Sequence, residues 1–472
     1  MNKNMSDTLP VICENAGRTI EVAMGTTLLE VERQLRLDGP HPFLAAYVNN
    51  RIKELNYRIY KPVTVRFIDI TSFEGIRVYQ RTISFILQKA VRELFPDRTL
   101  YIRHSLGASG FYCEISGFGP IPAEHLDAIK ARMRGIIDRN LPIQGVKMLT
   151  DTARKIYEGF GMADKIALLD SRPRLYSKIY TIDSLPGYFY GALTPSTGYT
   201  PQFDLHPYYN GFFIALPLRT DPTRLQQSVH QEKMFDVFHQ YQSWVEIMGV
   251  PTVGQLNSKV LAGDASELIK IAEAFHENKL AQVAGCVAEA NRERGVRLVL
   301  ISGPSSSGKT TFAKRLGVQL RVLGLNPVLI SLDDYFVDRE KTPRDEKGEY
   351  DYEALEAIDL GLFNDHLCRL MRGESVDIPR YDFITGRRTW HKNPLTLDPD
   401  RRRHPRAQPA PHPERPRSAE IPHLHLVLHV GGDGQPLAHR HDRQPPAAPP
   451  HARLYATRRR CRGDAFALGL RP

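Results

Sequence analysis

The sequence predicts a chain of mixed α/β domains that ends in a parallel α/β domain, and three observations support this fold class. Two short apolar runs, at 297–302 and 327–331, have the composition of buried parallel strands, and an apolar helical period over 310–323 separates them. The phosphate-loop pattern G-x-x-x-x-G-K-[ST] lies between the first run and that helix. Upstream, residues 8–70 combine short strand patterns with one capped helix, which is typical of a small separate α/β unit.

The composition excludes a membrane protein. No apolar run reaches the 18 or more residues of a membrane span, and the N-terminus lacks the apolar region of a signal peptide. We therefore expect a cytoplasmic protein with no membrane partner. A length of 472 residues allows about three domains.

Residues 8–70 predict a β-grasp unit. Thr27 and Glu30 have the spacing of a capping box before a short helix. Residues 61–67 place apolar side chains at every second position, as in a half-buried strand. Two strand patterns precede the helix and others follow it. This order resembles the TGS domain of threonyl-tRNA synthetases and of some GTPases and stress-response enzymes.

The next region has an amphipathic helix predicted over 83–95, which is followed by the stretch DRTLYIRHSLGASGFYCEI and later by LDAIKARMRGIIDRNL at 126–141. This order resembles the second additional domain of threonyl- and alanyl-tRNA synthetases, in which editing takes place. That family begins its first helix with a metal-binding H-x-x-x-H pair. The matching positions here hold Arg81 and Phe85, and residues 190–198 offer no Cys and His pair. Because Arg and Phe cannot ligate Zn²⁺, we expect the fold without the editing activity.

The loop GPSSSGKT predicts nucleotide binding. Glycines at both ends let the backbone N–H groups turn inward on a phosphate, next to the positive end of a helix dipole. We expect ATP here, with Lys309 reaching the β- and γ-phosphates and the Thr310 hydroxyl on Mg²⁺. The alternative interpretation is an ordinary Gly/Ser turn, and the flanking strand and helix argue against it. The predicted ATP contacts are Gly303, Ser305, Ser306, Ser307, Gly308, Lys309, Thr310 and Thr311.

Asp333 and Asp334 follow the second strand. Because loops at the carboxyl ends of parallel strands gather at one edge of a sheet, we expect these residues on the P-loop side. A carboxylate there can deprotonate an acceptor hydroxyl while Mg²⁺ and Lys309 neutralise the γ-phosphate. The alternative is a solvated acidic turn.

Four motifs in order, GPSSSGKTT, SLDDYF, EYDYEALEAID and IPRYDFITGRR, resemble the uridine kinase and phosphoribulokinase family. The resemblance implies that Asp333 is the catalytic aspartate, with Lys309 beside it. It also implies that Glu353 holds ribose hydroxyls and that Tyr381 lines the nucleoside pocket. Uridine kinases have a base-contacting His five residues after that tyrosine. This chain has Gly386 there, which leaves the identity of the acceptor open.

Residues 401–472 differ in composition from the rest of the chain. They hold 14 Arg, no Lys and 5 acidic residues, which gives a net charge of +9. Because the whole chain has a net charge of +10, the residues before 401 are nearly neutral. A disordered nucleic-acid-binding arm is one interpretation. We favour a change of reading frame near 398–401. A neighbouring frame can spell Thr-Val-Val-Val-Ile over 400–404, a buried-strand sequence, and an amphipathic segment from 431 onward. The family's further strand and Arg-rich lid would fall in this region.

We therefore expect an α/β P-loop kinase with an incomplete parallel sheet, preceded by a TGS-like β-grasp domain and an α+β synthetase-like domain. The predicted activity is ATP- and Mg²⁺-dependent phosphoryl transfer to a nucleoside or related small-molecule hydroxyl, impaired if the kinase C-terminal part is lost. The alternative is a nucleotide-sensing regulatory protein that contacts tRNA or the ribosome without kinase activity. The expected segments are 1–72 (TGS-like), 73–290 (synthetase-like, with a linker helix), 291–400 (kinase-like) and 401–472 (aberrant tail, disordered).

Overall fold

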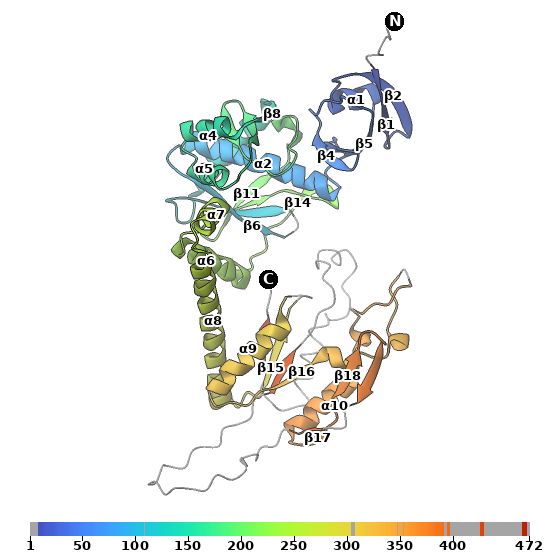
Figure 1. Ribbon diagram of the computed structural model, residues 1–472, viewed down its shortest axis with the longest axis vertical. Coiled ribbons are helices and arrows are strands. Elements are labelled where there is room, and N and C mark those ends of the chain that lie inside the picture. Colours follow the sequence, from blue (N-terminus) through green and yellow to red (C-terminus); the bar gives the residue numbers. More distant parts are fainter. Residues whose placement is uncertain are drawn as a thin grey trace. The chain divides into compact units, whose positions relative to one another are not determined.

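The computed structural model describes residues 8–396, except 108, 304–306, 347, 353 and 391–393, together with two strands at 425–428 and 465–469. The chain forms two compact units, Met1–Ala265 and Ser266–Pro472, and Figure 1 labels many of their elements. Among the described residues, no helix has both the length and the apolar composition that crossing a membrane requires.

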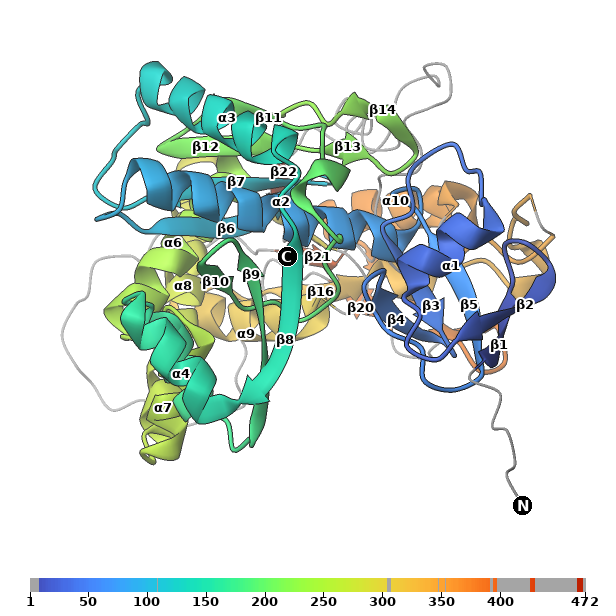
Figure 2. The ribbon, with the colours of Figure 1, turned by 90° about the horizontal axis from the view of Figure 1, so that it is seen from above.

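The first unit begins with a five-stranded mixed sheet in the order β2-β1-β5-β3-β4, in which β1 runs parallel to β5 (Figure 2). The capping box predicted at Thr27 is present: the Thr27 hydroxyl accepts from the Glu30 N–H at 3.2 Å, and the Glu30 carboxylate accepts from the Thr27 N–H at 2.7 Å. The β-grasp fold is confirmed. Its elements are β1 (Thr8–Cys13), β2 (Arg18–Ala23), α1 (Leu28–Leu35), β3 (Ala45–Val48), β4 (Arg51–Glu54) and β5 (Val63–Ile68).

The rest of the first unit is an α+β domain, as expected. An antiparallel sheet β11-β12-β7-β6 and a smaller sheet β10-β9-β8 share one large apolar core with α2 and α3. The helix α2 starts ten residues before the predicted 83–95 because the Ser72 hydroxyl caps it, accepting from the Gly75 N–H at 3.0 Å. The elements are α2 (Phe73–Leu94), β6 (Leu100–Leu106), β7 (Gly110–Ile115), α3 (Ala123–Asp138), β8 (Ile143–Leu149), α4 (Thr150–Gly159), α5 (Ala163–Asp170), β9 (Tyr176–Ile182), β10 (Leu185–Gly187), η1 (Thr197–Tyr199), β11 (Asp204–Tyr208), β12 (Gly211–Ala215), β13 (Pro217–Leu218), β14 (Asp221–Leu225), α6 (Glu232–Ile247) and α7 (Val253–Leu261).

The second unit contains a parallel sheet in the order β16-β21-β15-β22. Buried side chains of α8, β15 and α9 form one core, which includes Leu280, Val299 and Leu316. The strands and helix predicted around the phosphate loop are present within one residue of their expected ends. The elements are α8 (Ala265–Arg294), β15 (Leu298–Ser302), α9 (Lys309–Val322), β16 (Val328–Ser331), η2 (Leu332–Tyr335), η3 (Arg339–Lys341), η4 (Leu355–Ala357), α10 (Leu360–Met371), β17 (Ser375–Val376), β18 (Pro379–Asp382), β19 (Arg387–Trp390), β20 (Leu395–Thr396), β21 (His425–Leu428) and β22 (Ala465–Gly469).

Two strands of this sheet, β21 and β22, come from residues 401–472, where the sequence analysis expected no element. β21 pairs with both β15 and β16, and β22 pairs with the other edge of β15. The remaining residues of this segment lie outside the described part of the chain, so the predicted disorder and the predicted change of frame stay predictions, as do the domain boundaries.

Candidate functional site

The loop between β15 and α9 has the backbone geometry of a phosphate cradle. Gly308 has a φ of 81°, a left-handed conformation that glycine adopts without strain. The helix α9 begins directly after it, with its first hydrogen bond from the Phe312 N–H to the Gly308 carbonyl at 2.9 Å. In general the N–H groups of a first helical turn have no partner within their own helix, and such groups bind anions. Of the predicted ATP contacts, Ser305 and Ser306 lie outside the described residues; Gly303, Ser307, Gly308, Lys309, Thr310 and Thr311 are described.

Lys309 and Asp333, the two predicted catalytic residues, lie close enough to affect each other's ionisation. Lys309 is only 6% exposed. Burial lowers the pKa of Lys309, and the charge of Asp333 partly restores it. Burial and the neighbouring Asp334 raise the pKa of Asp333 to about 6, against the opposing effects of Lys309 and the Ser331 hydroxyl. A half-buried carboxylate therefore lies near enough to the cation of the phosphate loop for each charge to shift the pKa of the other.

The short helix η2 explains the position of Asp333. The Ser331 hydroxyl, at the end of β16, accepts from the Asp333 N–H at 3.3 Å and turns the chain into η2. Leu332 and Tyr335 are buried at 2% and 0% exposure, which anchors both ends of this turn in the core. Asp333 and Asp334 between them are less buried and lie at the carboxyl end of the strand, as predicted.

The oxygen donors at this site fit a magnesium ion with a bound nucleotide. Thr310 is exposed and follows Lys309 directly, and Asp333 and Asp334 supply carboxylates. Mg²⁺ prefers such hard oxygen ligands and usually combines one or two carboxylates with phosphate oxygens and waters. The Thr310 hydroxyl is thus the group that would hold it, together with phosphate oxygens of a bound nucleotide.

The acceptor side of the predicted site lies on the hairpin β18–β19. Tyr381, on β18, is 5% exposed, and β18 packs beside η2, the segment that carries Asp333. Gly386 closes the hairpin with a φ of 69° and donates its N–H to the Asp382 carbonyl at 2.7 Å. Glu353 lies outside the described residues, so its predicted role stays a prediction.

Arg388 fixes the hairpin against η2, a role that the sequence analysis did not assign. Its side chain is 13% exposed and forms an ion pair with Asp359 at 3.0 Å. It also donates to the backbone carbonyls of Tyr335 and Phe336 at 2.9–3.1 Å. The only signal in the sequence was its place in the GRR end of the fourth motif.

In the first unit, the positions that carry metal ligands in the synthetase editing domain are packed with other groups. Phe85 is fully buried, with its ring 5.1 Å from that of Phe189. Arg81 donates to the Ala192 carbonyl at 2.9 Å. The structure thus brings these positions beside the 187–192 segment. Within the described residues, no group of three His, Cys, Asp or Glu side chains could hold a metal ion.

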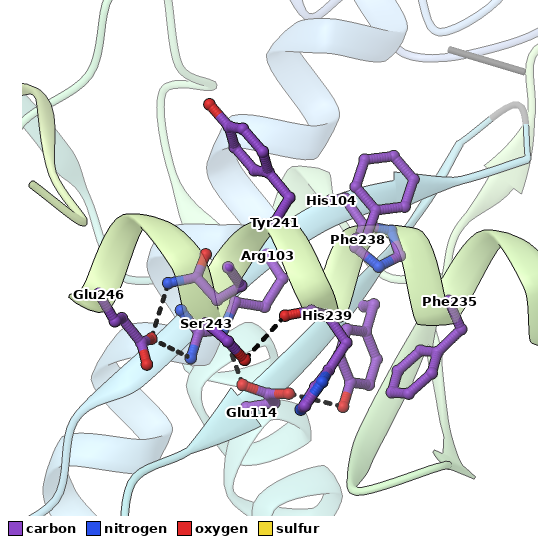
Figure 3. A pocket seen from close by; sticks show the side chains of 11 residues that line it. Arg103, His104, Glu114, Phe235, Phe238, His239, Tyr241, Ser243 and Glu246 are labelled. Carbon is purple, nitrogen blue, oxygen red and sulfur yellow. Dashed lines mark hydrogen bonds and ion pairs between the residues drawn. The ribbon is translucent and has the colours of Figure 1, made fainter. Parts of the chain in front are cut away.

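A separate cavity of about 250 Å³ lies between β6, β7 and α6 (Figure 3). Glu114 accepts from the Arg103 guanidinium at 2.7 Å and from the Tyr112 hydroxyl at 2.8 Å. Arg103 also pairs with Glu246 of α6 at 3.5 Å. The polar groups of this cavity thus form hydrogen bonds and ion pairs with one another, and the Arg103–Glu246 pair connects α6 to the sheet.

The comparisons with known proteins divide the chain in the same way as the motifs. Residues 298–400 match the model of the Phosphoribulokinase / Uridine kinase family. The N-terminal part is similar to threonine–tRNA ligases. The enzyme of Clostridium kluyveri is 28% identical over 157 residues, 33% of this chain and 24% of that enzyme. The enzyme of Symbiobacterium thermophilum is 29% identical over 190 residues, 40% of this chain and 29% of that enzyme.

The chain thus spans between a quarter and three tenths of the length of these relatives. A solved structure, "Structure of a Possible Uridine Kinase from Bacillus stearothermophilus", is 21% identical, with a TM-score of 0.21, over 31% of this chain and 65% of that one. The two resemblances expected from the sequence are therefore confirmed: the uridine kinase and phosphoribulokinase pattern in residues 298–400, and the threonyl-tRNA synthetase-like N-terminal part.

Proposed function

We propose that this chain transfers the γ-phosphoryl group of ATP, with Mg²⁺, to a hydroxyl group of a nucleoside or a related small molecule. The observation that carries the proposal is the pair of Lys309 and Asp333 at the phosphate loop. A buried cation at a helix N-terminus suits the γ-phosphate, and a half-buried carboxylate opposite it suits an acceptor hydroxyl. The family match over 298–400 supports the same reaction class.

Each residue has a distinct part in this reaction. Lys309 neutralises charge on the γ-phosphate, and Asp333 accepts the proton of the acceptor hydroxyl. The acceptor oxygen forms a bond to the γ-phosphorus as the bond from that phosphorus to the bridging oxygen of ADP breaks. A pKa of about 6 leaves Asp333 mostly ionised at pH 7 and makes it a stronger base than an ordinary aspartate. Bound Mg²⁺ supplies further charge neutralisation on the phosphates.

The test is a panel of nucleosides assayed for acceptor-dependent ADP formation with ATP and Mg²⁺. Lys309→Met is expected to lower kcat by roughly 100-fold or more, because the buried cation beside the phosphates is lost. Lys314→Met is the matched control, since Lys314 is an exposed lysine on the same helix. A Lys309→Met protein that phosphorylates nucleosides at the parent rate overturns the proposal.

A second candidate function is that of a nucleotide-sensing regulatory protein that contacts tRNA or the ribosome. The similarity of the N-terminal part to threonine–tRNA ligases favours it. Salt-sensitive tRNA binding together with no acceptor-dependent ATP turnover would support this candidate over the kinase.

The reading-frame hypothesis bears on both candidates, because it concerns residues that a complete kinase would use. An independent read of the coding DNA across codons 398–472 tests it. A single intact frame would refute the hypothesis, and a frame-corrected chain can be assayed beside the present one.

A further inference from the structure

The acceptor side of the second unit has a wall of aromatic rings. Phe336 lies 5.5 Å from Tyr381 and 6.1 Å from Tyr352, measured between ring centroids. Tyr381 in turn lies 4.9 Å from Phe383. Phe336 and Tyr381 are buried, whereas Phe383 is 55% exposed, and its ring can contact a planar ligand. The wall adjoins η2, since Phe336 directly follows that helix.

Arg339 projects into this wall and occupies the space above Gly386. Its backbone N–H donates to the Gly386 carbonyl at 2.8 Å. A Cβ built on Gly386 would lie 2.7 Å from the Arg339 Nε and 2.8 Å from its Cζ. A side chain at 386 and the present position of Arg339 therefore exclude each other. Gly386, where uridine kinases have a base-contacting His, makes room for a guanidinium.

One edge of this guanidinium is fixed and the other is available. The Arg339 Nε donates to the Tyr352 hydroxyl at 3.1 Å, and Nη2 donates to the Phe383 carbonyl at 2.6 Å. Both acceptors are neutral, and within the described residues Arg339 forms no ion pair. Nη1 and the second N–H of Nη2 form the terminal fork of the side chain, which is the edge that makes bidentate hydrogen bonds.

The two tyrosines beside Arg339 also offer donors. The Tyr381 hydroxyl is buried without a hydrogen bond of normal geometry, and the Arg339 guanidinium lies close enough to oppose the rise in its pKa that burial causes. The Tyr352 hydroxyl accepts from Arg339, which leaves its own proton to donate. Of the two carboxylates next to Arg339 in the sequence, Asp338 accepts from the Arg388 N–H at 3.0 Å and Glu340 pairs with Arg387 at 3.8 Å. Among the described residues, the wall therefore presents more donors than acceptors.

We infer that Arg339 determines the specificity of the acceptor site and selects a 6-oxopurine nucleoside, such as inosine or guanosine; this inference rests on the proposed kinase function. The O6 and N7 atoms of such a ring are two adjacent acceptors, which match the guanidinium fork. Adenine and cytosine place an amino donor at the corresponding edge, against the donors of Arg339. Uracil offers one acceptor there, O4, beside a C–H group.

The experiment measures kcat/KM for inosine, guanosine, adenosine, uridine and cytidine with the full chain, ATP and Mg²⁺. The parent is expected to prefer inosine and guanosine to adenosine by roughly tenfold or more. Arg339→Gln is expected to reverse this preference, because a glutamine amide pairs with N6 and N7 of adenine. Arg387→Gln is the control, since Arg387 adjoins Gly386 in sequence but has a side chain that is 74% exposed and forms an ion pair with Glu340 at 3.8 Å.

Calorimetric binding of inosine and of adenosine to the same proteins gives a readout that does not depend on turnover. Equal affinity of the parent for the two nucleosides, or an unchanged ratio in Arg339→Gln, overturns the inference. Should Arg339→Gln be insoluble, Gly386→Ala displaces the guanidinium and is expected to remove the preference. If inosine and adenosine are used equally in a turnover that depends on Lys309, the kinase proposal stands and the specificity inference fails. If inosine binds selectively but no nucleoside is phosphorylated, the kinase proposal fails instead.

Discussion

Replacing Asp333 with asparagine is expected to stabilise the second unit while it stops phosphoryl transfer. The pKa of Asp333 is raised from 3.8 to about 6, first by burial and then by Asp334. Between these values the folded unit holds the proton more tightly than the unfolded chain, so stability falls as pH rises through this window. A difference of about 2 pKa units corresponds to about 3 kcal/mol. Because the carboxylate is partly solvated, we expect about 1–2 kcal/mol.

The assay is urea unfolding at about pH 4.5, in the lower part of this window, and at about pH 8, above it. The chain has two tryptophans, Trp244 in the first unit and Trp390 in the second, so a Trp244→Phe background makes fluorescence report on the second unit alone. The free energy of unfolding of Asp333→Asn minus that of the parent should be larger by about 1–2 kcal/mol at the higher pH than at the lower pH. Asp365→Asn, at an exposed carboxylate, should stay within about 0.5 kcal/mol at both. An equal effect of Asp333→Asn at the two pH values would refute the reasoning.

Thr310→Val removes only a hydroxyl and is expected to raise the Mg²⁺ concentration for half-maximal turnover by roughly tenfold or more; an unchanged magnesium titration excludes Thr310 from the metal site. Gly308→Ala places a Cβ at a φ of 81°. It is expected to destabilise the second unit by about 1 kcal/mol and to weaken ATP binding in calorimetry, and wild-type values for both would contradict the cradle. Phe85→Ala is expected to cost the first unit about 3–5 kcal/mol, followed by Trp244 fluorescence, with ATP affinity unchanged. A matching loss of ATP affinity would show that the two units do not act separately.

The phosphate-binding part of the site could be predicted because its signals are local. The glycines, Lys309 and Thr310 are consecutive, and the apolar periods on either side place β15 and α9 within one residue of their observed ends. Asp333 follows from the same reasoning, since a parallel sheet brings the carboxyl ends of its strands to one edge. The capping box at Thr27 likewise depends on two residues three positions apart.

The acceptor side could not be predicted in the same way. Arg339 and Gly386 are far apart in sequence, and their contact depends on how the hairpin β18–β19 packs on η2. Arg388 and Asp359 meet for the same reason. The strand β21 has only four residues, too few for a periodic signal, and it enters the sheet between β15 and β16.

The most direct measurement is transfer of the labelled γ-phosphate of ATP to a nucleoside, followed by separation of the products. The account predicts a labelled nucleoside monophosphate that forms only with Mg²⁺ and an acceptor present, and that is absent with Lys309→Met and with Asp333→Asn. Labelled inorganic phosphate alone, or a labelled nucleoside monophosphate that persists in both variants, would contradict the assignment of this site as a kinase centre.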